Sequence, residues 1–222
     1  MVQKLKQKVM DGKEITKEKA MTLAEADLDE LCQEADEIRK HFCGNVFDIC
    51  SCINVKGGKC SEDCKFCPQS CFNDKVEVKP HTLIGSDQML EEAAYMAQKG
   101  VVRCDLVSSG RRLPKDDVRK IVQDIERIRK ETGIAVCCSF GLLDREDCEM
   151  LKKAGITRLH NNLESSRTFF TGVCSSHSTD DKMATLRAAR AAGLTLCSGC
   201  LINLGESMED RIELALMERE LG

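Results

Sequence analysis

The feature that most constrains this chain is a group of three cysteines, Cys60, Cys64 and Cys67, in the polar stretch KCSEDCKFC. Three thiolates gathered this closely suit a metal ion or an iron–sulfur cluster better than a structural disulfide. A cubane of four irons takes four ligands, so three cysteines leave one iron open to a small chelating cofactor. We therefore expect the rest of the chain to hold that iron beside a substrate.

Composition indicates one cytoplasmic domain. The chain has 222 residues, 42% of them hydrophobic but only 4% aromatic, which suits a single domain with an aliphatic core. The net charge of −4 argues against nucleic acid as a partner. No apolar run approaches the roughly 20 residues that span a bilayer, and the Lys-rich first residues do not resemble a secretory signal. We expect no membrane association.

Fifteen cysteines are a high number for such a chain. In a reducing compartment they are more readily explained by metal binding or catalysis than by disulfides. Any single cysteine on a strand can also be a small buried apolar side chain.

The order of elements predicts an α/β fold with a parallel sheet. Residues 1–20 resemble a loose, charged lead-in, and apolar spacing predicts a helix over 23–42. Further helices are expected over 86–99, 114–132, 144–154, 179–192 and from 207 to the end, and strands over 46–55, 101–107, 134–140, 156–163 and 194–202. Glycines at 100, 133, 155 and 193 fit left-handed helix ends.

Strands that alternate with helices in this way form parallel sheets. Five βα units are fewer than the eight of a closed barrel, which takes about 250 residues. We therefore predict a partial TIM-type (β/α) barrel over 46–222, incomplete at the C-terminus, preceded by an N-terminal helical extension over 1–45.

The cysteine triad resembles the signature of radical S-adenosylmethionine (SAM) enzymes, whose fold is a partial or full (β/α) barrel. From about Leu28 onward the chain also resembles the biotin synthase family, in the form found in anaerobes. The similar segments are HFCG at 41–44, FDIC at 47–50, the cysteine loop through Gln69, VSSG at 107–110, HNNLESS at 160–166 and CSG at 197–199. The triad alone identifies only the superfamily, and the later segments narrow it.

This resemblance implies that Cys60, Cys64 and Cys67 ligate a [4Fe–4S] cluster whose open iron binds SAM. One electron then cleaves SAM to a 5′-deoxyadenosyl radical, which removes hydrogen from dethiobiotin, and an auxiliary iron–sulfur cluster supplies the sulfur. It also implies a flavodoxin or ferredoxin as electron donor and a possible homodimer. No catalytic residue is expected beyond the cluster ligands.

The resemblance assigns cofactor contacts to four further residues. Phe66 would lie near the adenine, and Leu201 on a strand that backs it. Asn162 and Glu164 come at or just past the end of the strand over 156–163, where such barrels keep their sites. Asn162 would contact substrate or cofactor and Glu164 the ribose hydroxyls. Core packing for Phe66 and Leu201, and loop capping for Asn162 and Glu164, are the alternative interpretations.

For the auxiliary cluster, Cys137 and Cys197 match two of the family's ligands. Asp105 holds the third matching position, with Cys104 adjacent as a further candidate, and the family's arginine ligand would lie beyond Gly222. The usual [2Fe–2S] ligand set is thus incomplete, and another cluster type stays open. The surplus thiols available to it are Cys43, Cys50, Cys52, Cys138, Cys174 and Cys200.

Three alternatives stay open. A zinc knuckle would pair two short Cys/His hooks, but the first spacing here is three residues and no second hook is near in the sequence. A sibling radical enzyme, of the hydrogenase-maturation or pyrrolysine-pathway type, would share the triad. A truncated remnant would bind a cluster or a partner without turnover, because an early end leaves a sheet edge open.

Overall fold

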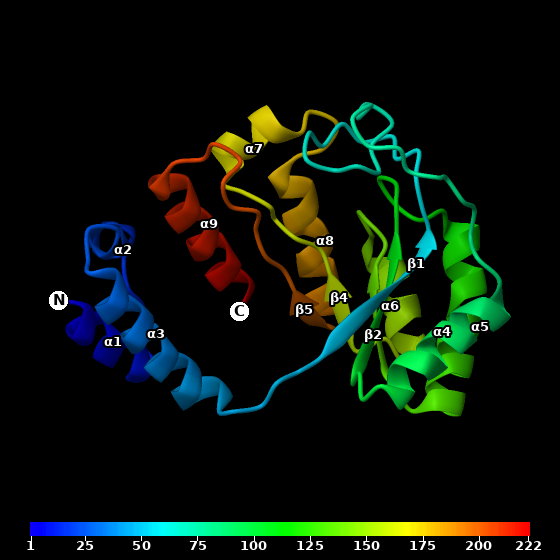
Figure 1. The fold of residues 1–222 in the computed structure, drawn as a ribbon, viewed down its shortest axis with the longest axis horizontal. Coiled ribbons are helices and arrows are strands. Elements are labelled where there is room, and N and C mark those ends of the chain that lie inside the picture. The colour runs from blue at the N-terminus through cyan, green and yellow to red at the C-terminus, as the bar shows by residue number, and fades with distance from the viewer.

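The computed structural model describes residues 1–222. Five parallel strands form one sheet in the order β1-β2-β3-β4-β5 (Figure 1). The strands are β1 Cys50–Lys56, β2 Arg103–Ser108, β3 Ala135–Ser139, β4 Arg158–His160 and β5 Thr195–Cys197. The helices are α1 Val2–Met10, α2 Lys17–Leu23, α3 Leu28–Cys43, α4 Ser86–Gln98, α5 Lys115–Thr132, α6 Arg145–Ala154, α7 Arg167–Val173, α8 Thr179–Ala191 and α9 Met208–Leu221.

The predicted α/β fold with parallel strands is confirmed, and so are the predicted glycines at the helix ends. Gly100, Gly133, Gly155 and Gly193 all have positive φ just after a helix, because only glycine takes the left-handed conformation there without strain. The last two strands are shorter than predicted. Beyond β4 and β5 the two segments of the chain stay adjacent through isolated backbone hydrogen bonds. In one of these, the Glu164 amide donates to the Gly199 carbonyl at 3.1 Å.

The prediction of a loose lead-in over residues 1–20 is wrong, because α1 and α2 lie there. Val2 is buried, α1 packs on α3, and Lys6 forms an ion pair with the buried Glu34. Thr16 caps α2 by accepting from the Lys19 amide at 3.5 Å. The short helix α7 was also not predicted, and Ser166 caps it by accepting from the Phe169 amide.

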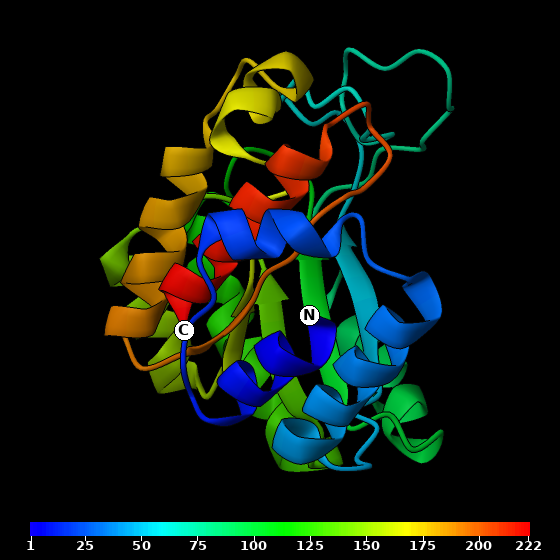
Figure 2. The same ribbon diagram turned by 90° about the vertical axis from the view of Figure 1, so that its left-hand side faces the viewer.

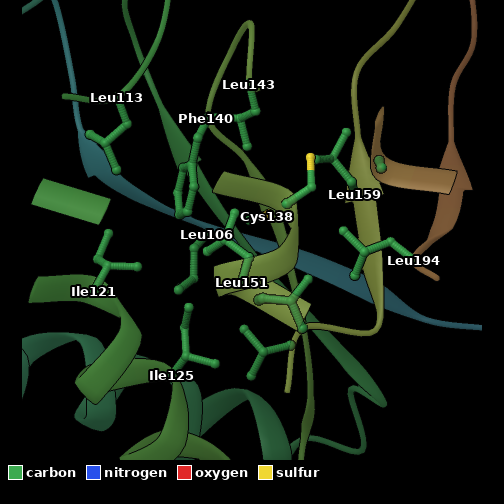
Figure 3. Close-up of a cluster of buried hydrophobic side chains, with 14 of the residues drawn as sticks. Leu106, Leu113, Ile121, Ile125, Cys138, Phe140, Leu143, Leu151, Leu159 and Leu194 are labelled. Atoms are coloured by element: carbon green, nitrogen blue, oxygen red, sulfur yellow. The ribbon is translucent and has the colours of Figure 1, made fainter. Parts of the chain in front are cut away.

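One hydrophobic core fills the space between the sheet and the helices α4, α5, α6 and α8, and α9 adds side chains to it. Because successive strand side chains point to opposite faces, every second strand residue enters this core. Leu106, Cys138 and Leu159 enter from the strands, and Ile125 and Leu151 from the helices (Figure 3). All are at most 1% exposed, so this layer fixes the positions of the strands.

The opposite face of the sheet, here called the inner face, is polar. Cys52, Asp105 and Cys137 stand on it in register on three neighbouring strands. The N-terminal helices lie on this side of the sheet, away from α4 and α5 (Figures 1 and 2), whereas α9 contributes side chains to the core. None of the helices combines the length and the apolarity that crossing a bilayer requires.

Candidate active site at the carboxyl end of the sheet

The cysteine loop leaves β1 and is closed on itself by backbone hydrogen bonds. The Cys60 amide donates to the Gln69 carbonyl at 2.8 Å, and the Cys71 amide donates to the Cys60 carbonyl at 2.9 Å. A tight turn brings the Cys67 amide to the Cys64 carbonyl at 3.1 Å. The loop therefore presents its thiols from a fixed backbone.

A second segment, residues 172–177, clamps this loop from outside. The Lys65 amide donates to the Val173 carbonyl at 3.1 Å. Asp63 accepts from the amides of Ser175 and Ser176 at 2.9 and 3.0 Å. These hydrogen bonds, with the donation of the Ser175 hydroxyl and Cys174 thiol, hold the pKa of Asp63 far below its usual range. A carboxylate so strongly bonded fixes the loop to the segment after α7.

All three predicted cluster cysteines line one cavity of about 490 Å³. Cys60 is buried, and Cys64 and Cys67 are half-buried. Burial raises the pKa of Cys60 and of Cys64, and the charge of Cys67 raises both further. Thiolates at these positions would be stabilised by a bound cation.

The end of β4 supplies a hydrogen-bonded chain to the same cavity. His160 Nδ1 lies 3.1 Å from Asp105 Oδ2, and its Nε2 lies 2.9 Å from Asn162 Oδ1. The Asp105 carboxylate raises the pKa of His160 more than burial lowers it. Lys182 of α8 donates to the Asn162 carbonyl at 2.9 Å. Both His160 and Asn162 are therefore held against the cavity wall.

Glu164 lines the cavity in an unusual state. Its φ of 71° is left-handed, which is rare for a residue with a side chain. Its Oε2 is buried without a hydrogen-bond partner, and burial raises the pKa of the carboxyl. An unsatisfied buried acceptor costs about 1–3 kcal/mol, so an atom of this kind is typical of a position that a ligand completes.

Phe66 and Leu201 differ in placement. Phe66 lines the cavity and also packs against the small cluster of Phe170, Val173 and Cys174, so it takes part in packing, and its contact with the adenine stays a prediction. Leu201 is not among the cavity residues. It lies beyond β5 rather than on the predicted strand, and its amide donates to the Glu164 carbonyl at 3.0 Å.

The candidate auxiliary thiols divide between the two faces of the sheet. Cys137 on β3 and Cys197 on β5 point to the inner face, and Cys50 and Cys52 on β1 join them there. Burial and the charge of Asp105 raise the pKa of Cys137 to about 12. Cys104, by contrast, is fully buried in the core on the other face.

Cys104 is therefore not brought together with the other candidates. The physical reason is strand alternation, since Cys104 shares its face with Leu106 and leaves the inner face to Asp105. Cys138 is in the core for the same reason. Cys43 and Cys200 are exposed.

Two further residues lie beside the cysteine loop: Cys174, which the sequence offered only as a surplus thiol, and His177, which sequence reasoning missed. Cys174 Sγ lies 3.6 Å from Cys64 Sγ, and His177 Nδ1 lies 3.3 Å from Cys174 Sγ. The C-x-x-H spacing at 174–177 is the local sign that points to them. The zinc alternative required a second short Cys/His pair, which the sequence does not show near the triad. Cys174 and His177 form such a pair, and it contacts Cys64 in the folded protein.

Comparison with known proteins agrees with this geometry. Residues 54–217 match the radical SAM superfamily. The solved structure of methylornithine synthase (PylB) superimposes with a TM-score of 0.83 at 22% identity, covering 98% of this chain and 64% of that one. The hydrogenase maturase HydG gives 0.80 at 19% identity, covering 99% and 50%. The fold and the cysteine loop thus define a radical SAM enzyme.

Curated relatives narrow this class. Biotin synthase 2 of Corynebacterium diphtheriae is 50% identical over 221 residues, which cover 100% of this chain and 67% of the relative. The biotin synthase of Brachyspira hyodysenteriae is 47% identical over 218 residues, covering 98% and 65%. The chain belongs to the biotin synthase family. It spans about two thirds of the length of these relatives.

Membership implies a [4Fe–4S] cluster and SAM as cofactors, and the residues present fit both. Three free thiols on one rigid loop face one cavity, which suits a cluster that takes three protein ligands. The unpaired Oε2 of Glu164 in the same cavity suits a hydroxyl donor such as a ribose.

Proposed function

We propose that this chain carries the sulfur insertion that converts dethiobiotin to biotin. The observation that supports it is the meeting of the cysteine triad with Phe66, Asn162 and Glu164 on one cavity. Identity of 50% to a biotin synthase, against 22% to PylB, favours this activity over the sibling enzymes. We also propose that it acts in the cytoplasm and receives its electron from a flavodoxin or ferredoxin.

In this proposal Cys60, Cys64 and Cys67 bind three irons of the [4Fe–4S] cluster. When bound, the cluster supplies the electron that cleaves SAM. Glu164 accepts hydrogen bonds from the ribose hydroxyls through its free Oε2, and Asn162 orients substrate or cofactor from the end of β4. Phe66 forms an apolar wall beside the cysteine loop and keeps water from the adenine side.

For the auxiliary cluster we propose the inner-face thiols. Cys137 and Cys197 are the ligands that the family resemblance assigns, and Cys50 and Cys52 share their face of the sheet. Asp105 stands among them with Oδ1 buried and unpaired. The buried, anionic Asp105 suits a site that holds iron rather than a packed apolar interior.

Anaerobic reconstitution of the chain with iron and sulfide, followed by SAM, a reductant and dethiobiotin, tests the proposal. Formation of 5′-deoxyadenosine together with biotin is the expected result. 5′-Deoxyadenosine without biotin would instead indicate a sibling activity or an incomplete sulfur donor. A reconstituted cluster that never cleaves SAM would indicate a remnant without turnover, and the absence of a cluster spectrum would overturn the assignment of the triad.

A further inference from the structure

A compact group of metal-ligating side chains lies beside the cysteine loop, and two of its three members, Cys174 and His177, are not used by the proposed reaction. One ligand atom each from Cys64, Cys174 and His177 lies within 4.8 Å of the others. Cys174 is 3% exposed, and the His177 side chain is 8% exposed. Two thiols and an imidazole that converge in a buried place are the donor set of a mononuclear zinc-type site.

A carboxylate stands next to these three donors. Asp63 Oδ1 lies 3.2 Å from Cys174 Sγ. Tetrahedral sites for Zn²⁺, or for its spectroscopic substitute Co²⁺, take four ligands from cysteine, histidine and carboxylate groups. Because Asp63 already accepts from the amides of Ser175 and Ser176, it supports Cys174 from outside the ligand set, and water takes the fourth position.

The histidine is oriented as metal-ligating histidines are. Its Nδ1 lies 2.6 Å from Glu62 Oε2, and the Glu62 side chain is itself only 8% exposed. A carboxylate that accepts from one ring nitrogen fixes the tautomer and leaves the lone pair of the other nitrogen for a metal. Here that other nitrogen is Nε2, which lies 3.9 Å from Cys174 Sγ. Ser176 also donates to the same Glu62 oxygen at 2.9 Å, so this supporting carboxylate is held in place.

We propose that the cluster-free protein binds one divalent, borderline-soft cation such as Zn²⁺ through Cys64, Cys174 and His177, and that this ion competes with the [4Fe–4S] cluster for Cys64. Binding displaces the two thiol protons to solvent and leaves two thiolates on the cation. Because both need the Cys64 thiolate, the ion and the complete cluster exclude each other, whereas Cys60 and Cys67 take no part in binding the ion. The sharing of Cys64 rests on the proposed cluster site, whereas the cation site itself does not.

Titration of the anaerobic, cluster-free protein with Co²⁺ tests the site without any activity measurement. Tetrahedral thiolate ligation of Co²⁺ gives intense visible d–d bands. The wild-type chain should bind one equivalent of Co²⁺ with such bands. Cys174→Ser or His177→Gln should lower the affinity for Co²⁺ by more than the roughly 10–100-fold that a change outside the ligand shell costs. Glu62→Gln should weaken it by about 10-fold and keep the tetrahedral bands.

Cys60→Ala and Cys67→Ala are the matched controls, because each removes a thiol of the same loop but leaves the proposed cation site whole. Both should bind Co²⁺ as the wild type does. An unchanged titration in Cys174→Ser and His177→Gln would overturn the site. So would a loss in Cys60→Ala as large as in Cys174→Ser, since the cation would then lie within the cysteine triad.

Competition is tested by adding one equivalent of Zn²⁺ before reconstitution with iron and sulfide. The wild type should lose most of its cluster absorbance, and Cys174→Ser should keep it. Cluster assembly that proceeds equally with and without Zn²⁺ would overturn the sharing of Cys64. If no variant or wild type assembles a cluster, the proposed function fails, while the Co²⁺ titration still decides the cation site.

Discussion

His160 on β4 reaches across β3 to Asp105 on β2, with its Nδ1 3.1 Å from the Asp105 Oδ2. Asp105 is 3% exposed and its other oxygen has no partner, so the imidazole is its one hydrogen-bonded neighbour on the inner face. A buried carboxylate keeps its charge only where a cation or donor compensates it. The pair therefore fixes the distance between two strands that are not adjacent.

We predict that His160→Leu destabilises the cluster-free protein by about 3 kcal/mol at pH 6, because it leaves the Asp105 charge uncompensated. Asp105 raises the pKa of His160 above its unfolded value. The charged pair therefore stabilises the fold fully below the unfolded pKa of about 6.5 and less as the pH rises through the folded pKa. Urea unfolding should show a smaller loss at pH 9 than at pH 6.

A double variant provides the control for this pair. Adding Asp105→Asn to His160→Leu removes the orphaned charge, so most of the lost stability should return. Equal losses at pH 6 and pH 9, or no recovery in the double variant, would contradict the pairing.

Glu164→Gln should stabilise the fold and weaken cofactor binding at once. Burial raises the pKa of Glu164, so the folded state prefers the neutral carboxyl. The charged form costs stability as the pH rises above the unfolded value of about 4.3. At pH 7 we expect a gain of about 1–2 kcal/mol that vanishes near pH 4. SAM affinity of the reconstituted protein should fall about tenfold, or about 1.4 kcal/mol.

Glu218→Gln is the matched variant for this prediction. Burial raises the pKa of Glu218 as well, but the Ser198 hydroxyl donates to it at 2.8 Å and it does not line the cavity. SAM affinity should stay unchanged in Glu218→Gln. Unchanged affinity in Glu164→Gln would show that the free Oε2 does not face the cofactor.

The parts of the fold that the sequence predicted well are those that local chemistry decides. Gly133 and Gly155 end helices because the left-handed backbone favours glycine. Asp144 and Ser207 begin helices because each side chain accepts from an amide three residues on. The alternation of helix and strand between these points was sufficient to predict a parallel sheet.

The parts that the sequence predicted poorly depend on distant packing. Cys174 and His177 gain meaning only when the segment after α7 folds against the cysteine loop, more than a hundred residues away in the chain. Cys104 was predicted as a ligand because it adjoins Asp105. Since side chains alternate along β2, Cys104 lies on the same face as Leu106 and is buried in the core. α1 is stabilised by its contact with α3, which a charged stretch read alone does not reveal.

Two cysteine variants separate the two proposed iron sites. Cys64→Ala should abolish the charge-transfer absorbance of the [4Fe–4S] cluster, because it removes one of three ligands on one rigid loop. Cys137→Ala should keep that absorbance and lower only the additional iron, since Cys137 lies on β3 at the inner face. Absorbance and iron content of the reconstituted proteins measure both effects.

Cys148→Ala serves as the thiol control for these variants. Cys148 is fully buried in the main core on α6, away from the cavity. It should leave absorbance and iron content unchanged. Loss of the first cluster in Cys137→Ala would mean that the two sites are not separate.

The loops after β2 and β3 approach each other at Gly141, which makes this glycine a test of how the cavity is built. Its φ is +75°, and a Cβ there would lie 2.3 Å from the Arg111 carbonyl oxygen. The Leu142 amide donates to that same oxygen at 2.8 Å, so the backbone has little freedom to retreat. Gly141→Ala should therefore cost about 3 kcal/mol or more, the left-handed strain plus the clash.

Gly133→Ala isolates the strain alone, because its φ of +71° is similar and its Cβ would meet nothing within 4 Å. It should cost about 1 kcal/mol. Arg111 also contacts Glu62 at 3.5 Å, so a shift of its backbone reaches the cysteine loop. We expect reconstituted cluster content to fall in Gly141→Ala and to stay unchanged in Gly133→Ala at a temperature where both are folded. Equal stability and equal cluster content in the two variants would mean that the close approach at Gly141 does not shape the cavity.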